Sequence, residues 1–121
     1  MATTPQIVEA IIQSLPNKSQ LAIYATEIPN MRPPQITSLR TRQSYTPDMV
    51  IKSKDLMHIF SIETNSPVVL SDSFLKKVRL FSIHAEKHAG RLYIVAKSNF
   101  ISKVKVRLKN KYRNIDYLTI Q

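Results

Sequence analysis

Residues 46–65 (TPDMVIKSKDLMHIFSIETN) constrain the fold more than any other stretch of this chain. Two runs rich in β-branched and aromatic side chains, 49–51 and 58–62, flank a polar break. This pattern is typical of two antiparallel strands joined by a short loop. We therefore expect a β-hairpin whose turn is centred between Asp55 and Leu56.

The predicted register of this hairpin places Asp48 opposite Glu63. Because side chains alternate along a strand, one face is expected to carry Asp48, Val50, Lys52, Ile59, Ser61 and Glu63. The other face is the more apolar and is expected to be the core; it carries Met49, Ile51, His58, Phe60 and Ile62.

Two carboxylates in directly opposed positions repel each other, because their Cβ atoms lie only about 4.5–5.5 Å apart. The pair of Asp48 and Glu63 therefore needs a compensating cation. The obvious candidate is Mg²⁺, which binds one or two carboxylates together with water and phosphate. The alternative is a different register, in which both acids point into water and bind nothing.

The composition bounds the class of protein. With 121 residues and 43% hydrophobic side chains, the chain is expected to form one folded domain over residues 1–121. There is no cysteine, which excludes disulfides and thiolate metal sites. No apolar run approaches the roughly 18 residues that span a bilayer. The first residues also lack a basic secretion signal, so a soluble, cytoplasmic protein is expected.

Positive charge is concentrated in the last part of the chain. Residues 1–75 carry six basic and six acidic side chains, whereas residues 76–121 carry twelve basic and two acidic ones. The whole formal net charge of +10 therefore belongs to the last 46 residues. A local surplus of this size attracts polyanions, nucleic acid first and anionic membrane second. The alternative is that these side chains only keep the protein soluble.

Before the hairpin, the pattern predicts a helix and a strand. The helix is expected to open at Thr4-Pro5 and to end near Leu15. Residues 21–26 fit either a short strand or a helical extension. Residues 29–34 hold three prolines and are expected to be irregular. Residues 35–45 permit a strand that would form the first arm of a meander leading into the hairpin.

After the hairpin, the sequence predicts a second helix and a buried strand. Ser71 or Asp72 is expected to cap this helix. Gly90, the only glycine, is expected to supply a left-handed residue just past its end. The continuous apolar run 92–96 is typical of a buried central strand.

The end of the chain allows two interpretations. Apolar residues recur at helical spacing over 98–112, which favours a third helix capped by Ser98. Residues 103–108 (KVKVRL) alternate between basic and apolar side chains, however, and also permit a strand. The helix is preferred, and residues 115–120 are expected to form a last strand.

The predicted order of elements is αβββαβαβ, with Pro47-Asp48 at the base of one strand and Glu63 late in the next. This order and these residues resemble the PD-(D/E)xK nuclease superfamily, which has the restriction-endonuclease-like fold. The run 90–97 (GRLYIVAK) resembles the strand that follows the motif helix in this family. The resemblance implies an α/β (α+β) protein with a mixed sheet of four to five strands flanked by helices, hydrolysis of phosphodiester bonds and, because small members often act as dimers, a homodimer.

The resemblance also implies a metal site. Asp48 and Glu63 would bind Mg²⁺, together with the carbonyl oxygen of Thr64. Glu9 would be the counterpart of the acidic residue that family members often carry on the first helix.

The family's lysine should stand two residues after Glu63, where this chain has Asn65. An amide carries no charge and cannot act as a base at neutral pH. Within the resemblance, the lysine is replaced either by Lys52 on the acid-bearing face or by Lys76 or Lys77 on the following helix. Lys52 or Lys77 would then stabilise the pentacovalent phosphorane.

The basic residues are expected to contact a phosphate backbone, of DNA ahead of RNA and not of a membrane. The expected nucleic-acid-binding residues are Arg40 and Arg42, on one face of the strand 35–45, and Lys103, Lys105, Arg107, Lys109, Lys111 and Arg113 of the third helix. Two other functions stay open: a non-catalytic protein of the same fold that still binds nucleic acid, and a structural or assembly protein that binds an acidic partner.

Overall fold

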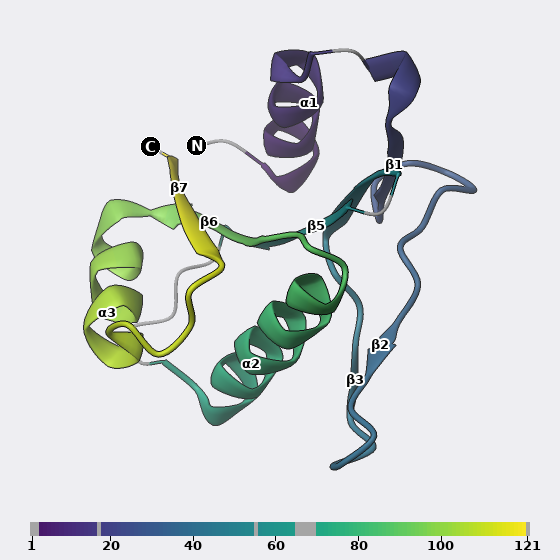
Figure 1. Cartoon of the computed structure of the whole chain (residues 1–121). Coiled ribbons are helices and arrows are strands. Elements are labelled where there is room, and N and C mark those ends of the chain that lie inside the picture. The colour runs from purple at the N-terminus through teal and green to yellow at the C-terminus, as the bar shows by residue number, and fades with distance from the viewer. Residues whose placement is uncertain (1–2, 17, 55, 65–69, 121) are drawn as a thin grey trace.

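The computed structural model describes residues 3–16, 18–54, 56–64 and 70–120, and its architecture is α/β (Figure 1). Three helices surround a five-stranded mixed sheet, and a short hairpin extends from it. The helices are α1 (Thr4–Ser14), α2 (Asp72–Lys87) and α3 (Ser98–Leu108), with a 3-10 turn at Lys18–Gln20. The strands are β1 (Ala22–Ala25), β2 (Ile36–Thr37), β3 (Ser44–Tyr45), β4 (Met49–Ser53), β5 (Leu56–Glu63), β6 (Leu92–Lys97) and β7 (Ile115–Ile120). None of the described helices combines the length and the apolar character that crossing a bilayer requires.

The five-stranded sheet has the strand order β1-β4-β5-β6-β7. Strands β1, β4 and β5 are antiparallel neighbours, whereas β5, β6 and β7 are parallel. Parallel strands need a crossover connection. Here α2 connects β5 to β6, and α3 connects β6 to β7.

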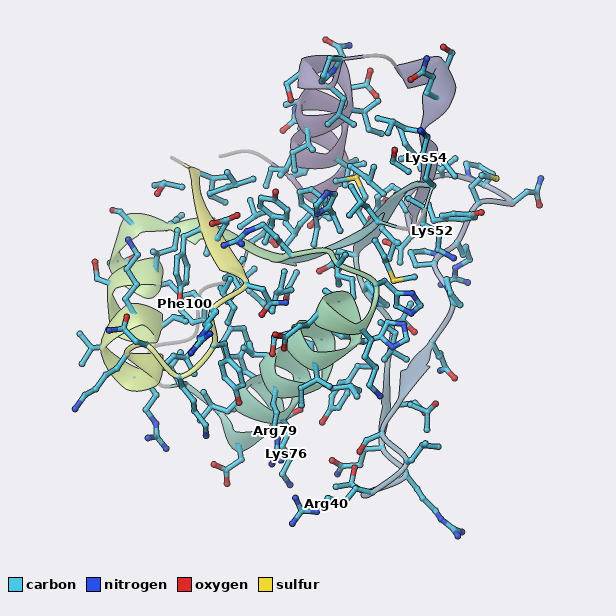
Figure 2. All side chains as sticks on the ribbon, viewed as in Figure 1. Arg40, Lys52, Lys54, Lys76, Arg79 and Phe100 are labelled. Atoms are coloured by element: carbon cyan, nitrogen blue, oxygen red, sulfur yellow. The ribbon has the colours of Figure 1, made fainter. Side chains whose placement is uncertain are left out.

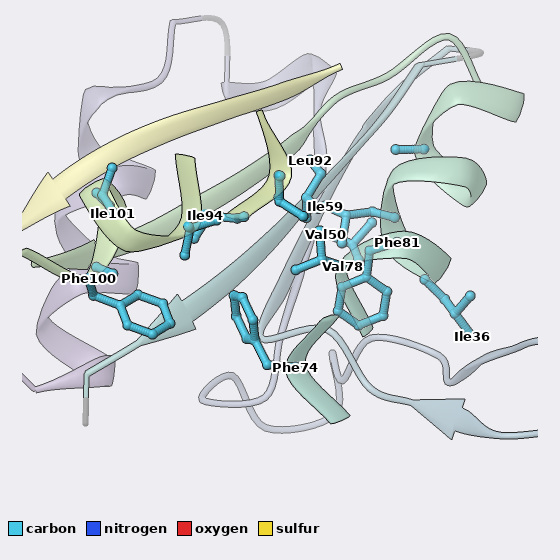
Figure 3. Close-up of a cluster of buried hydrophobic side chains, with 14 of the residues drawn as sticks. Ile36, Val50, Ile59, Phe74, Val78, Phe81, Leu92, Ile94, Phe100 and Ile101 are labelled. Carbon is cyan, nitrogen blue, oxygen red and sulfur yellow. The ribbon is translucent and has the colours of Figure 1, made fainter. Parts of the chain in front are cut away.

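Helices cover both faces of the sheet. The face with Val50 and Ile59 packs against α2 and α3, as the cluster in Figure 3 shows. The opposite face, with Met49 and Phe60, packs against α1. The prediction that only the second face forms the core was therefore incomplete. Central strands of a sheet that carries helices on both faces are buried on both sides.

The register of the β4–β5 hairpin differs from the prediction by two residues. Met49 pairs with Phe60, which puts Asp48 opposite Ser61 and not opposite Glu63. The two strands join after Ser53 pairs with Leu56, so the turn is centred one residue earlier than predicted. Asp55, in that turn, lies outside the described residues. Because the register changed by an even number, Asp48, Ser61 and Glu63 still share one face.

The third antiparallel strand of the sheet comes from residues 22–25, which could have been strand or helix. The segment 35–45 was predicted to be an arm of the main meander, and this was wrong: it forms the separate β2–β3 hairpin. Arg40 and Arg42 lie in the turn of this hairpin, where Arg42 has a left-handed φ of 61°. They therefore do not share the face of a strand as expected.

The second and third helices confirm the predicted types, with differences at their ends. The side chain of Ser71 accepts a hydrogen bond from the Phe74 N–H and caps α2, as expected. Residues 103–108, which also permitted a strand, belong to α3. Ser98 does not cap α3: it is the first helical residue, and Lys97 precedes it without a side-chain cap. The helix ends at Leu108, so the basic residues after it lie in the connection to β7.

Gly90 is needed for close packing and not for a left-handed conformation. The left-handed residue at the end of α2 is Ala89, with a φ of 55°. The N–H groups of Ala89 and Gly90 donate to the carbonyls of Glu86 and Ala85, which is the Schellman arrangement. A Cβ atom on Gly90 would lie only 1.6 Å from the carbonyl oxygen of Met57. The absent side chain thus lets the end of α2 meet the start of β5.

Replacing Gly90 by Ala should lower the free energy of unfolding by about 3 kcal/mol or more, because backbone would have to move to admit the Cβ atom. Urea unfolding followed by circular dichroism measures this change. Ala89→Gly is the matched control and should be neutral or stabilising, because it relieves a left-handed non-glycine residue. A loss below about 0.5 kcal/mol in Gly90→Ala would contradict the packing argument.

Candidate active site

Asp48 immediately precedes the first residue of β4 and lies beside β5. Its own N–H donates to the carbonyl of Phe60 at 3.2 Å. Its Oδ2 atom accepts a hydrogen bond of 2.7 Å from the N–H of Ile62. The preceding Pro47 is fully buried, which fixes the entry of the chain into β4. The carboxylate therefore substitutes for the next backbone carbonyl of the β4–β5 ladder and has one defined orientation.

Glu63 is the last residue of β5 and lies on the same face of the sheet as Asp48. Its Oε1 atom accepts hydrogen bonds from the hydroxyl of Ser61 at 3.0 Å and from the Nζ of Lys77 at 2.6 Å. The side chains of Lys77 and Glu63 are only 21% and 19% exposed, so this ion pair is shielded from water. Lys77 comes from the second turn of α2 and also lies over the ring of Phe74.

The electrostatics join these residues into one site. Burial raises the pKa of the Asp48 carboxyl, and the negative charges of Glu63 and Glu27 add to this effect. The hydrogen bond from Ile62 and the positive charge of Lys77 act in the opposite direction. The pKa of Asp48 thus depends on the charges of both Glu63 and Lys77. The cation that the sequence argument required for two acids on one face is supplied, at least for Glu63, by a lysine side chain.

The other predicted catalytic residues lie elsewhere. Lys52 pairs with Met57 near the turn of the hairpin, four residues along β4 from Asp48, and its Nζ lies over the ring of Tyr24. Glu9 is exposed on α1, the helix on the opposite face of the sheet, and accepts a hydrogen bond from Gln13. Of the candidate lysines, Lys77 is therefore the one that contacts Glu63, and its charge also acts on Asp48.

Thr64, Asn65 and Ser61 are neighbours of Glu63 in the sequence. Thr64 follows Glu63 and is half-buried, whereas Asn65 lies outside the described residues. Ser61 was assigned to the acid-bearing face but not to the site. It is fully buried, and its hydroxyl orients Glu63. The hairpin turn was the signal that could have found it, because a turn one residue earlier puts Ser61 opposite Asp48.

The donor atoms fit a hard divalent cation. The second carboxylate oxygens, Oδ1 of Asp48 and Oε2 of Glu63, accept no hydrogen bond from any residue that the structure describes. The same residues contain no group of three or more His, Cys, Asp or Glu side chains that could hold a metal ion. Two carboxylates, completed by water and a substrate phosphate, are a donor set that suits Mg²⁺.

The predicted nucleic-acid-binding residues fall into two separate groups. Lys103, Lys105 and Arg107 on α3, and Lys109, Lys111 and Arg113 after it, are all exposed. The Nζ atoms of Lys105 and Lys111 lie over the rings of Tyr117 and Tyr112. Arg40 and Arg42 lie at the tip of the β2–β3 hairpin, and α2 separates them from α3 (Figure 1).

Comparisons with known proteins were made with family models, with curated sequences and with solved structures, and none of the three finds a match. A function for this chain therefore has to come from the chemistry of its own residues.

Asp48→Asn should stabilise the protein at pH 7, because the amide oxygen can still accept the Ile62 hydrogen bond without the cost of a buried charge. The folded-state pKa of Asp48 is raised, so the stability that its protonated form contributes is present below its unfolded pKa and is lost as pH rises through the folded pKa. The gain at pH 7 should be about 0.5–2 kcal/mol and should vanish at low pH. Urea unfolding at pH 7 and pH 3 measures both.

The matched control is Asp72→Asn, which changes an exposed aspartate in the first turn of α2. This variant should lose a few tenths of a kcal/mol at pH 7, because an acid there favours the helix dipole. A clear loss of stability in Asp48→Asn at pH 7 would show that the charged form is the stabilising one.

Proposed function

We propose that this protein is a Mg²⁺-dependent nuclease that hydrolyses phosphodiester bonds in DNA. The observation that carries the proposal is the meeting of Asp48, Glu63 and Lys77 on one face of the sheet, at the end of β5 and beside the first turns of α2. Two acids and a lysine are the groups that metal-assisted phosphoryl chemistry uses: acids to hold the metal and a cation to balance the charge of the phosphate.

The topology supports a restriction-endonuclease-like core for this proposal. When the β2–β3 hairpin is set aside, the elements of the main sheet follow the order α1, β1, β4, β5, α2, β6, α3, β7. This is the αβββαβαβ order expected of the PD-(D/E)xK superfamily. In it, Asp48 precedes the second strand and Glu63 ends the third, which agrees with the roles that the resemblance gives them.

In this proposal, Lys77 takes the role of the family's lysine, whose place in the sequence is occupied by Asn65. The motif lysine would stand two residues after Glu63 in the sequence, whereas Lys77 reaches the same acid from α2. The positive charge of Lys77 neutralises charge on a phosphate oxygen, which the uncharged amide of an asparagine cannot do. The short contact with Glu63 keeps the ammonium group at the site when no substrate is present.

Each residue then has a defined task. Asp48, fixed by the Ile62 N–H, and Glu63, oriented by Ser61, would hold Mg²⁺ through their second carboxylate oxygens, with the Thr64 carbonyl as a third donor. Bound Mg²⁺ supplies Lewis acidity and lowers the pKa of a coordinated water. Lys77 binds a non-bridging oxygen of the phosphate and stabilises its developing negative charge.

A second function is favoured by one specific observation. The residue directly opposite Asp48 is Ser61, not an acid, and Glu63 is already paired with Lys77. A site with this arrangement also suits a protein that binds nucleic acid through its basic surface without cutting it. In that case the acids and the lysine serve to hold α2 on the sheet.

The nuclease proposal predicts cleavage of fluorescently labelled DNA in Mg²⁺ or Mn²⁺ and none in EDTA. Asp48→Asn and Glu63→Gln should each lower the rate at least 10²-fold, because each removes a metal ligand. Lys77→Met should lower it about 10²–10³-fold, the usual cost of losing one group that stabilises transition-state charge. Denaturing gels of single-stranded, duplex and supercoiled substrates measure these rates.

Glu9→Gln is the control, because Glu9 lies on α1, away from the acids, and its loss should leave the rate unchanged. The proposal fails if the purified protein binds DNA but cuts none of these substrates with either ion. It also fails if Asp48→Asn keeps the wild-type rate. The first result would favour the non-catalytic binding protein.

A further inference from the structure

A groove runs between the β2–β3 hairpin and α2, apart from the acids. It encloses a cavity of about 750 Å³, within the range of sites that hold whole ligands. One wall of it comes from the β2–β3 hairpin, within residues 37–45, and the other from α2, within residues 76–87. In Figure 2, Arg40 at the hairpin tip points toward the end of α2 that carries Lys76 and Arg79.

The lining of this groove is positively charged. Arg40, Lys76, Arg79 and Lys87 are exposed, and no carboxylate is among the lining residues. None of these four makes an ion pair with another residue that the structure describes. Burial, followed by the positive charges of its neighbours, lowers the pKa of His84 on the same wall. Like charges gathered without acids repel one another, so this surface favours an anionic ligand.

The groove also exposes apolar side chains between its cations. Leu39 at the hairpin tip is 93% exposed, and Ile83 on α2 is 40% exposed. Tyr45 and Leu80 lie half-buried in the same lining. Two exposed apolar side chains on facing walls do not help the fold. They offer a ligand exposed apolar surface beside positive charge.

We propose that this groove binds single-stranded nucleic acid, with phosphates on the cations and bases on the apolar side chains. A single strand presents unpaired base faces, which stack on an aromatic side chain such as Tyr45 and also bury the apolar surface of aliphatic side chains, and a basic groove follows its backbone. A duplex hides those base faces and would leave Leu39 and Ile83 without a partner. An acidic peptide would pair with the cations, but it has no base faces to place against Leu39 and Ile83.

Both walls of the groove belong to segments that also carry residues of the candidate active site. Tyr45 stands three residues before Asp48, and Lys76 is the neighbour of Lys77. A strand that lies in the groove would therefore be held by the same two segments that carry Asp48 and Lys77. As a path for substrate, the inference rests on the proposed nuclease function; as a binding site, it does not.

The test is fluorescence anisotropy with a fluorescein-labelled dT12 strand and with a duplex of equal length, in EDTA, using the Asp48→Asn background so that nothing is cut. The single strand should bind more tightly than the duplex. The double variant Lys76→Gln, Arg79→Gln should weaken binding at least tenfold. It should also lower the slope of log K against log salt by about 1.4, because each lost phosphate contact removes about 0.7.

Leu39→Ser tests the apolar part of the groove. It should weaken binding about fivefold or more, because a base would no longer bury the apolar surface of the leucine, and the salt slope should stay unchanged. The matched control is Arg32→Gln, Lys54→Gln, which removes two exposed cations that do not line the groove and should leave binding within twofold of the parent protein. Thermal melting of each variant checks that it is folded.

The inference is overturned if the duplex binds more tightly than the strand, or if the control pair weakens binding as much as the groove pair. It is also overturned if poly-glutamate displaces the strand at equal charge concentration, which would indicate an acidic protein partner, or if no strand binds. Failure of cleavage with intact groove binding would reject only the nuclease. Cleavage with no effect of the groove variants would reject only the groove.

Discussion

The ion pair between Lys77 and Glu63 is the contact on which the rest of the structure depends. It joins α2 to the end of β5 in a half-buried place, where an unpaired carboxylate would be costly. The position of Lys77 is set by the start of α2 at the Ser71 cap and by its end, where Gly90 meets Met57. Helix packing thus decides which cation reaches the acids, and the chemistry of the site follows from it.

Much of the fold could be predicted because its signals are local. The strand alternation of residues 46–63 was enough to put Asp48 and Glu63 on one face. The turn was placed one residue too late, which moved the partner of Asp48 from Ser61 to Glu63. A shift of the turn by one residue changes the register by two, so it alters the partner of each residue but not its face. The predicted face was therefore right, and the predicted pair was wrong.

The rest depended on contacts between distant parts of the chain. Lys52 and Lys77 were both reasonable replacements for the missing lysine, and only the packing of α2 brings Lys77 to Glu63. The short strand β1 joined the sheet, although residues 35–45 offered a longer candidate. The charge surplus was correctly located after residue 75 but was assigned mainly to α3. The cations spaced along α2, with the exposed Ile83 among them, were a sequence signal for the groove that the predictions did not use. The other wall of this groove comes from the β2–β3 hairpin.

The central claim is that Asp48 and Glu63 hold a divalent cation together. Crystals soaked in Mn²⁺, with diffraction recorded at the manganese absorption edge, test it most directly. We expect an anomalous peak within coordination distance of the Oδ1 atom of Asp48 and the Oε2 atom of Glu63, with Lys77 still paired with the Oε1 atom of Glu63. A map with no peak there at saturating Mn²⁺ would contradict the claim.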